Sequence, residues 1–572
     1  MRILGLNMGV TRDGSVQLKD GAAALVEDGR VVVAVAEERL SRSKHMGGAD
    51  LAFRYCLDTV GLAPDDLDML VISTCSEPAA EDGYGAAHFG VAAEKVRAMP
   101  SHHLSHAASA FFLSPFEGAA IAVLDNEGNL LGEPAARRWH SRFERNSYYL
   151  GQGHDLRRLS DADDGLDESE IGPGEVYRHF TYYLGWRSYV YAGKTMGLAA
   201  FGRPGAFGDV PLFTVAGGKL RTKLPNGHDE PTSTVRLFCA SHGVDLGPPR
   251  RPDEALTQRH ADIARLVQDA LEEALVAKLR ALRQLTGSDN LCLAGGVALN
   301  CVANRRILDE TGFRRIFVSS APGDTGQSIG NAMWGWHVLA GQKRFPYGES
   351  APAQLGRVYP ASEILAAVRS LPSSFEVGRS ENVAAEAAAL VAAGYVIGWF
   401  QGGSELGPRA LGGRSMVADP RRAAMPDYLN LVVKRRESFR PFAPSVLEHQ
   451  ASKFFDLPQN APYMEFTAAV LPEVRPVVPA IVHIDGTARL QTVPAGSGIY
   501  AALIEEFERI TGVPMVLNTS FNLGGESIVE TPADAVDCFA RSLLDRLVIG
   551  DFIVRRQGPA DTTGFDRWGT DG

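Results

Sequence analysis

Short apolar runs divided by polar turns dominate the beginning of the chain. Three of these runs, rich in aliphatic residues, are Ile3–Asn7, Gly21–Gly29 and Arg30–Glu38. The turn Glu27-Asp28-Gly29 favours a tight hairpin between the last two, because Asp-Gly pairs accept the positive φ angles that such turns need. We therefore expect three N-terminal strands. The polar loop TRDGSVQLKD, residues 11–20, lies between the first and the second strand.

The same pattern returns later in the chain. A second strand set begins at Gly118–Asn129, and the segments Asn290–Ile307 and Ala321–Trp334 each read as a strand, a glycine turn and a helix. Two similar halves predict an α/β protein with the duplicated actin-like ATPase fold. A glycine turn that opens a helix exposes backbone N–H groups to an anion. Gly295 and Gly296 are therefore candidate nucleotide-binding residues.

A change of composition marks a domain boundary. The amphipathic segment Asp262–Leu285 predicts a long helix, whereas residues 336–361 are rich in Gly and Pro. We place the boundary there, with one domain over residues 1–352 and a second, α+β domain over residues 353–572. A chain of 572 residues is long enough for at least two cores.

Charge and cysteine content narrow the function classes. The formal net charge of -11 offers no footprint for nucleic acid or an anionic membrane, and the longest apolar run is too short for a bilayer span. Six scattered cysteines without a CxxC pair indicate reduced thiols in a cytoplasmic protein, and the N-terminus does not read as a signal peptide. The oligomeric state is left open, with a homodimer as one option.

Two histidines and two carboxylates form a candidate metal site. His102 and His106 stand four residues apart, so they share one face if the segment is helical. A pair of packed histidines is the alternative. Asp125 and Asp324 each follow a predicted strand, where α/β folds present ligands. The four side chains suit a borderline divalent ion such as Fe²⁺, Mn²⁺ or Zn²⁺.

Basic residues concentrate at glycine-rich turns of the second domain. Arg409 and Arg414 lie in GWFQGGSELGPRALGGRS, and Lys434 to Arg440 includes four cations. Arg489, Asn518 and Ser520 follow in later segments. In an acidic protein such a set predicts a small-anion site, since Arg binds phosphate in a bidentate fashion. The N-terminal patch RLSRSKH is basic as well, with a solvated loop as its alternative.

These segments together resemble the O-carbamoyltransferase family of antibiotic and nodulation-factor biosynthesis. The resemblance runs through EERLSRSKH, HHLSHAASA, GKTMGLAAFG, AGGVALNCVANRRI, GPRALGGRS, KRRESFRPFAPS, HIDGTARLQTV and NTSFN. It implies a Kae1-like first domain of the actin-like fold and a YrdC-like second domain. It also implies a reaction in which carbamoyl phosphate and ATP give carbamoyladenylate, whose carbamoyl group passes to a hydroxyl of a small molecule.

The resemblance assigns roles to individual residues. Metal ligands would be His102, His106, Asp125 and Asp324, with Fe²⁺ the favoured ion, and Mg²⁺ would accompany ATP. Carbamoyl phosphate would meet Arg409, Lys434, Arg440, Arg489, Asn518 and Ser520. Nucleotide contacts would come from Lys44, Lys194, Gly295, Gly296, Asn300 and Gly323. Catalytic candidates are Asp13, Lys19, Asp20 and Lys44.

One departure from the family pattern is at Lys19, where relatives carry a histidine on the acceptor side. A charged lysine cannot take a proton, so we expect Lys19 to position a substrate and Asp13 or Asp20 to accept the proton. Two alternatives stay open. A tRNA-modifying enzyme would need a basic surface, and a regulatory nucleotide-binding protein would lack transfer activity. The acceptor is not readable: an aminoglycoside, a macrolide or other polyketide, a sugar and a cephem all fit.

Overall fold

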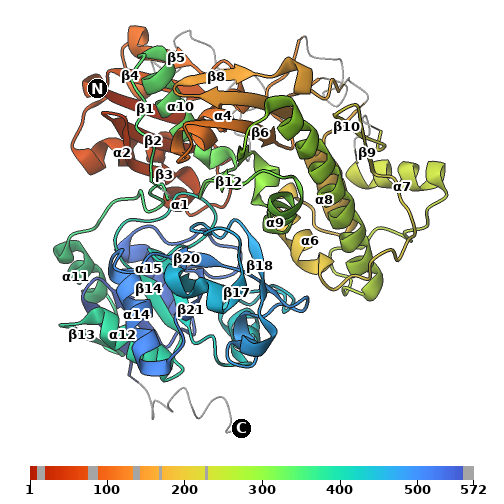
Figure 1. Ribbon diagram of the computed structural model, residues 1–572. Helices are drawn as coiled ribbons and strands as arrows, with labels where there is room; N and C mark the ends of the chain where they lie inside the picture. Colours follow the sequence, from red (N-terminus) through yellow and green to blue (C-terminus); the bar gives the residue numbers. More distant parts are fainter. Residues whose placement is uncertain are drawn as a thin grey trace. The chain divides into compact units, whose positions relative to one another are not determined.

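The computed structural model describes residues 1–9, 20–74, 88–132, 142–166, 170–225, 230–348 and 350–557. These residues form two compact units (Figure 1). The first unit holds residues 1–37 and 45–351, and the second holds Glu38–Lys44 together with residues 352–572. The predicted domain division placed Glu38–Lys44 in the first domain, whereas the structure groups this segment with the second. Within the described ranges, no helix combines the length and the apolar character needed to cross a bilayer.

Two five-stranded sheets with the same topology form the first unit. The first sheet has the order β3-β2-β1-β4-β5, with β1 (Arg2–Asn7), β2 (Ala22–Glu27), β3 (Arg30–Ala36), β4 (Met69–Ser73) and β5 (Val96–Ala98). The second has the order β8-β7-β6-β11-β12, with β6 (Gly118–Leu124), β7 (Asn146–Gln152), β8 (Asp155–Arg158), β11 (Asn290–Ala294) and β12 (Arg315–Val318).

Strand directions repeat as well as strand order. In each sheet the first three strands in sequence form an antiparallel meander, and the remaining two add parallel to its first strand. The predicted hairpin joins β2 to β3 through Asp28 and Gly29, both at positive φ. The duplicated actin-like α/β fold predicted from the sequence is therefore confirmed.

Two helices hold the halves of the first unit together. The helix α4 (His102–Leu113) follows the first sheet but packs on β6, β7 and β11 of the second. Conversely, α10 (Gln327–Trp334) follows the second sheet and packs on β1, β2 and β4 of the first. The helices also pack against each other, at Gly330, where a Cβ would lie 2.0 Å from the Ser105 carbonyl oxygen. This exchange brings segments from both halves to one place.

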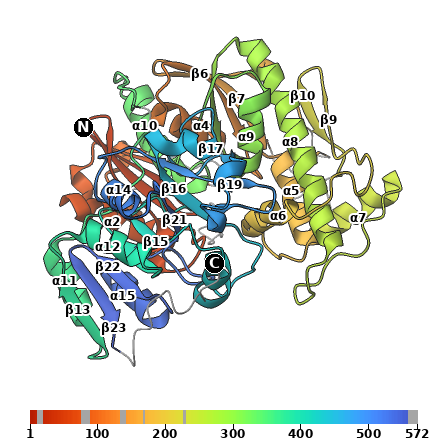
Figure 2. The same ribbon diagram turned by 60° about the horizontal axis from the view of Figure 1, so that its bottom comes forward.

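The remaining elements of the first unit surround this core. They are α2 (Asp50–Val60), α5 (Pro173–Tyr183), α6 (Ala192–Ala199), β9 (Phe213–Ala216), β10 (Lys219–Thr222), α7 (Pro231–His242), α8 (Gln258–Thr286) and α9 (Cys301–Glu310). The long helix predicted over Asp262–Leu285 is α8, which begins four residues earlier and packs against α5, α6 and α9 (Figure 2).

An eight-stranded mixed sheet is the centre of the second unit. Its order is β13-β23-β22-β14-β15-β21-β16-β20, with β13 (Phe375–Arg379), β14 (Ile397–Phe400), β15 (Arg414–Ala418), β16 (Ala443–Leu447), β20 (Gln491–Val493), β21 (Met515–Ser520), β22 (Arg546–Ile549) and β23 (Phe552–Arg556). A smaller sheet contains β17 (Phe455–Asp456), β18 (Thr467–Val470) and β19 (Thr487–Arg489).

Helices cover the large sheet, whose central strands are buried along their length. The helices are α11 (Ala361–Arg369), α12 (Val383–Ala392), the one-turn α13 (Met425–Asp427), the π-helix η9 (Tyr428–Val433), α14 (Ile499–Thr511) and α15 (Pro532–Arg541). The helices α12 and α14 pack together, and α15 packs on β14 and β22 with α11 beside it. An α+β second domain was predicted. Its likeness to YrdC stays a prediction.

Arginines attach the short helix α1 (Glu37–Ser41) and the residues after it to the second unit. Arg39 is 2% exposed and donates to the carbonyl oxygens of Glu405 and Gly407, at 3.2 and 2.8 Å. Arg42 donates to the carbonyl oxygens of Ser527 and Ile528, at 2.8 and 2.5 Å. These bonds explain why the chain leaves the first unit at Glu38 and returns at His45. The solvated-loop alternative for RLSRSKH is wrong at Arg39.

Candidate functional site

The four predicted metal ligands come from three places in the first unit. His102 and His106 lie in the first two turns of α4, Asp125 directly follows β6, and Asp324 begins the one-turn helix η7 (Asp324–Gly326) before α10. The helix α4 begins at His102 because the Ser101 side chain caps it, accepting from the Leu104 N–H at 3.1 Å.

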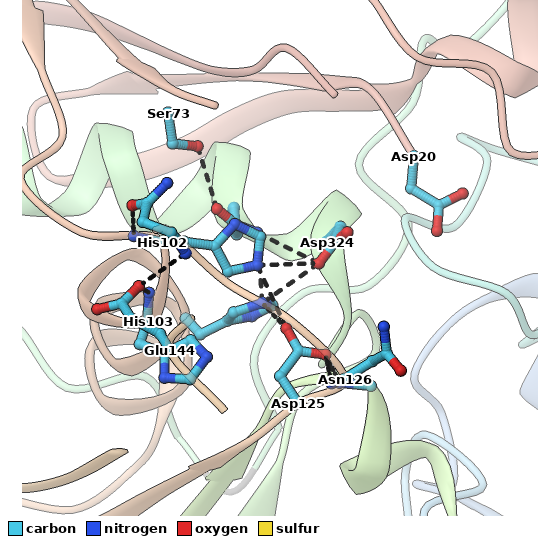
Figure 3. Close-up of polar contacts among 12 residues, drawn as sticks. Asp20, Ser73, His102, His103, Asp125, Asn126, Glu144 and Asp324 are labelled. Carbon is cyan, nitrogen blue, oxygen red and sulfur yellow. Dashed lines mark hydrogen bonds and ion pairs between the residues drawn. The ribbon is translucent and has the colours of Figure 1, made fainter. Parts of the chain in front are cut away.

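The structure brings the four side chains together in a buried cluster (Figure 3). From Asp125 Oδ2 the distance is 3.2 Å to His102 Nε2 and 3.4 Å to His106 Nε2. From Asp324 Oδ1 the corresponding distances are 3.4 and 3.3 Å. All four ligand atoms lie within 4.8 Å of one another. We call these residues the tetrad.

Backbone amides fix the orientation of Asp125. Its Oδ1 accepts from the N–H groups of Asn126 and Gly296, at 2.8 and 3.1 Å, which leaves Oδ2 facing the two imidazoles. The preceding Gly295 has a φ of +86°, and a Cβ there would lie 2.3 Å from the Leu124 carbonyl oxygen. Position 295 therefore requires glycine. The Gly296 N–H, which the sequence suggested for a bound anion, donates to the Asp125 carboxylate in the structure.

Gln327 also reaches the tetrad, although the sequence analysis did not single it out. Its Nε2 lies 3.0 Å from His102 Nε2, 3.3 Å from His106 Nε2 and 3.3 Å from Asp324 Oδ1. Its Oε1 accepts from the Ser73 hydroxyl at 3.1 Å. A lone glutamine in a helix carries no chemical signal of its own, so the tertiary structure was needed to find it.

Charge in the tetrad favours a cation. Burial lowers the pKa of His106, but hydrogen bonds that its imidazole donates to the carboxylates of Asp125 and Asp324 more than compensate and raise the pKa above the usual value. Burial would raise the pKa of both carboxyls, yet the histidines hold them below their usual range. Two ionised carboxylates and two imidazole nitrogens at this spacing fit a divalent ion of the Fe²⁺, Mn²⁺ or Zn²⁺ type.

The structure describes only some of the residues predicted to handle protons. Asp13 and Lys19 fall in residues 10–19, outside the described ranges. Asp20 precedes β2, and its Oδ1 lies 2.8 Å from Nδ1 of His45. Asn7, at the end of β1, donates from its Nδ2 to the carbonyl oxygens of Asp20 and Asp324, both at 3.1 Å. Asp20 is therefore tied to the loop that carries a tetrad residue.

The predicted nucleotide contacts of the first unit have structural partners. The Asn300 Oδ1 caps α9 by accepting from the Ala303 N–H at 3.1 Å, and its amide pairs with Gln268. Lys194 Nζ lies 4.3 Å from the Tyr191 ring centroid. Gly323 is half-buried directly before Asp324. The role of all three in nucleotide binding stays a prediction.

Five cations gather in the second unit. They are Lys44, Lys434, Arg436, Arg440 and Arg489, named here the cation cluster. Burial, followed by the charges of Arg440 and Arg489, lowers the pKa of Arg436 to about 9. Burial and Arg489 likewise lower the pKa of Arg440, against the opposing effect of Glu437. Lys44 belongs to the second unit, where burial and then the charges of Arg440, Arg39 and Arg436 lower its pKa against the opposing effect of Glu38. Its contact with the nucleotide, together with Gly295 and Gly296, stays a prediction.

Lys434 organises the loop that follows β21. It is 2% exposed, and its ammonium contacts the carbonyl oxygen of Ser520, the carbonyl oxygen of Asn522 at 3.0 Å and the Asn522 Oδ1 at 2.8 Å. Burial, together with Arg436, Arg440 and Lys44, holds its pKa well below the usual value. Lys434 therefore holds the Ser520 and Asn522 loop in place, and its contact with carbamoyl phosphate stays a prediction.

Asn430 positions the arginines of the cluster. Its Oδ1 accepts from Arg436 Nε at 2.7 Å, and its Nδ2 donates to the carbonyl oxygens of Ser438 and Arg440, at 3.2 and 2.9 Å. Arg440 Nη1 lies 3.9 Å from the Glu437 carboxylate. Asn430 is buried in the π-helix η9, and the sequence analysis missed it because its role depends on this irregular turn.

The two arginines of the glycine-rich turns both donate hydrogen bonds to backbone carbonyl oxygens. Arg414 is fully buried and donates to the carbonyl oxygens of Gln401, Gly402 and Gly413. Arg409 donates to the Tyr463 carbonyl oxygen at 3.2 Å, and burial raises the pKa of nearby Glu465 to about 8. The Asn518 amide donates to the Ala410 carbonyl oxygen at 3.0 Å, which ties β21 to the same turn.

Comparison with known proteins gives the family. Models described as Carbamoyltransferase N-terminus match residues 12–94 and 89–333, and the Carbamoyltransferase C-terminus model matches residues 388–556. Nodulation protein NolNO of Sinorhizobium fredii is 36% identical over 97% of this chain and 83% of its own. Uncharacterized protein sll1178 of Synechocystis is 34% identical over 97% of this chain and 98% of its own.

Solved structures are more distant. An activator of the 2-hydroxyisocaproyl-CoA dehydratase from Clostridium difficile with bound ADPNP aligns with 58% of this chain and 94% of its own, at 14% identity and a TM-score of 0.32. That similarity is too low to inform the assignment, which rests on the two family models and the relatives that span nearly the whole chain. The chain therefore belongs to the carbamoyltransferase family and is a carbamoyltransferase.

Proposed function

We propose that this carbamoyltransferase is ATP-dependent and transfers the carbamoyl group of carbamoyl phosphate to a hydroxyl of a small natural product, through carbamoyladenylate. The observation that carries the proposal is the cation cluster of the second unit, where arginines depress one another's pKa. Such a site is electrostatically strained when empty and gains stability from a multiply charged anion. Carbamoyl phosphate, ATP and pyrophosphate are anions of this kind.

Activation is assigned to the second unit. Arg440 and Arg489 would neutralise phosphate oxygens, while Lys434 holds the Ser520 and Asn522 loop in place through three acceptors. Water hydrolyses carbamoyl phosphate to carbamate and phosphate. A carbamate oxygen then attacks the α-phosphate of ATP, and the bond to the β-phosphate breaks with release of pyrophosphate. Because carbamate is a poor nucleophile, fixed positive charge and exclusion of water are what this step needs from the protein.

Transfer is assigned to the first unit. His102, His106, Asp125 and Asp324 would hold a divalent ion, with Fe²⁺ as the proposed ion, and a bound ion would polarise a carbonyl or phosphoryl oxygen. The acceptor oxygen forms a bond to the carbamoyl carbon, and the bond from that carbon to the AMP phosphate breaks. The acidic charge of the chain favours a small-molecule acceptor over nucleic acid.

Two measurements on the purified protein test the proposal. Pyrophosphate release should require both ATP and carbamoyl phosphate, and mass spectrometry of a hydroxyl-acceptor panel should show one added carbamoyl group. Arg440→Ala should abolish pyrophosphate release. The matched control is Arg509→Ala, which removes an exposed arginine paired with Glu506 on α14. Pyrophosphate release without carbamoyl phosphate, or unchanged release in Arg440→Ala, would contradict the proposal.

A further inference from the structure

The pair formed by His45 and Asp20 lies on strained backbone in the first unit. Both residues have positive φ angles, +57° and +30°, a region that residues other than glycine seldom adopt. Such conformations persist where the surroundings fix them and often mark a functional site. Here the Gly21 N–H donates to the Met46 carbonyl oxygen at 2.9 Å, and the Gly21 carbonyl oxygen accepts from the Glu37 N–H at 2.8 Å.

Gly21 allows the segment after His45 to approach β2. A Cβ built on Gly21 would lie 1.5 Å from the Gly48 carbonyl oxygen, so no side chain fits between the two segments. The close approach holds His45 beside Asp20, with Nδ1 and Oδ1 2.8 Å apart. The pair is therefore built into the packing of this sheet edge and is not an accidental surface contact.

The pair also lies near the tetrad. Asn7 is 1% exposed and donates from one Nδ2 to the carbonyl oxygens of Asp20 and Asp324, each at 3.1 Å. In the view of Figure 3, Asp20 lies beyond Asp324 as seen from His102. The backbone of Asp20, directly before β2, and the backbone of Asp324 thus share one hydrogen-bond donor.

The chemistry of the pair is that of an oriented base. When the Nδ1–H of an imidazole donates a hydrogen bond to a carboxylate, the proton stays on Nδ1 and the lone pair of the ring lies on Nε2. Each of the two side chains remains 27% exposed, so the pair is partly open to a small molecule from solvent. We propose that His45 is the general base that takes the proton of the acceptor hydroxyl and that Asp20 positions it.

The proposal rests on the function proposed above and completes its transfer step. The acceptor O–H gives its proton to His45 Nε2 while its oxygen bonds to the carbamoyl carbon of carbamoyladenylate. The bond between that carbon and the AMP phosphate oxygen breaks, and AMP leaves with the electron pair. The imidazolium then releases its proton to solvent. The products are the carbamate ester, AMP and one proton.

This assignment revises the expectation that Asp13 or Asp20 is the base. An Asp20 carboxylate that accepts a hydrogen bond from His45 is a weaker proton acceptor than a free one. An imidazole is better matched to hydroxyl activation near neutral pH. A positioning role for Asp20 also explains why its carboxylate faces His45 in the structure.

Variants of the pair separate the two roles. The enzyme variants His45→Ala, His45→Gln, Asp20→Asn and the double variant are assayed with ATP, carbamoyl phosphate and the acceptor found by the panel, or methanol as a surrogate. The readout is carbamoylated product per pyrophosphate released. The control is His88→Ala, since His88 pairs with Asp50 at 2.5 Å on the surface of the same unit. Added imidazole tests for restoration of transfer in His45→Ala.

We expect His45→Ala and His45→Gln to lower product per pyrophosphate by about 100-fold or more, the usual contribution of a general base. Asp20→Asn should lose less, and the double variant should be no worse than His45→Ala. Imidazole should restore part of the transfer in His45→Ala only. Full transfer in both His45 variants, or abolition in Asp20→Asn with active His45 variants, would overturn the assignment. Wild-type enzyme that carbamoylates no acceptor would overturn the proposed function and this inference together.

Discussion

Glu465 should make the stability of the second unit strongly dependent on pH. Glu465 is 3% exposed, and burial raises the pKa of its carboxyl from 4.5 to about 8, against the opposing effect of hydrogen bonds from the backbone and of the Arg409 charge. In the folded protein the group stays protonated where the unfolded chain would ionise it. The raised pKa therefore contributes stability in full below pH 4.5, and that contribution is lost as pH rises through about 8.

The magnitude follows from the difference in pKa. Each pH unit between the unfolded and folded values costs about 1.4 kcal/mol of unfolding free energy, so the loss reaches about 3 kcal/mol by pH 7 and about 5 kcal/mol above pH 9. Glutamine imitates the protonated carboxyl and does not ionise. For a unit of this size, Glu465→Gln should melt roughly 6–12 °C above wild type at pH 7 and at the same temperature near pH 4.5.

Calorimetry of wild type and Glu465→Gln across this pH range measures the difference directly, because all other titrating groups are common to both proteins. The control is Glu473→Gln, which changes an exposed carboxylate in the same unit and should give a small offset that does not vary with pH. Parallel melting curves for wild type and Glu465→Gln from pH 4.5 to 9 would show that Glu465 is ionised in the folded protein and that the reasoning is wrong.

Three other predictions concern the sites described above. His106→Ala should lose the divalent ion, as measured by elemental analysis, and full metal content in this variant would remove His106 from the ligand set. In the wild-type protein, protons should begin to compete with the ion above pH 6.5, because the carboxylates raise the pKa of His106. Lys434→Met should reduce pyrophosphate release while the fold, followed by circular dichroism, is retained; wild-type release would exclude a role in activation. Arg39→Ala should lower the unfolding free energy in urea by roughly 2–4 kcal/mol, since it leaves two buried carbonyl groups without donors, whereas Arg30→Ala on the surface should change it little; equal effects would contradict the anchoring role.

Pattern alone predicted the elements whose hydrophobic period is regular. The hairpin at Asp28 and Gly29, the long helix α8 and the duplication of the two sheets follow from local runs and turn residues. The tetrad was predicted because His102 and His106 are helix neighbours, and carboxylates after strands converge at one sheet edge. In these cases, residues that are close together in the sequence are enough to predict how the elements pair and pack.

What the sequence did not predict depends on contacts between distant segments. Nothing local shows that Arg39 is buried against Glu405, or that Asn430 in a π-helix fixes Arg436 and Arg440. The pairing of His45 with Asp20 needs the close approach at Gly21, which only the folded backbone reveals. Five of the six cysteines lie buried and unpaired among the described residues, and the reduced state of the thiols stays a prediction.

The segment Glu38–Lys44, which belongs to the second unit although the chain on both sides of it belongs to the first, limits how the two units can be separated in evolution. The chain passes from one unit to the other after Glu37, after Lys44 and again after Ala351, so no single cut separates the two. A fragment that begins at residue 352 lacks the guanidinium groups that satisfy the carbonyl oxygens of Gly407 and Ser527. One crossover at the unit boundary would therefore not exchange the complete second unit. A natural fission or a recombinant swap must carry this seven-residue segment along with the C-terminal part, or supply other donors for the carbonyl oxygens that its arginines bind.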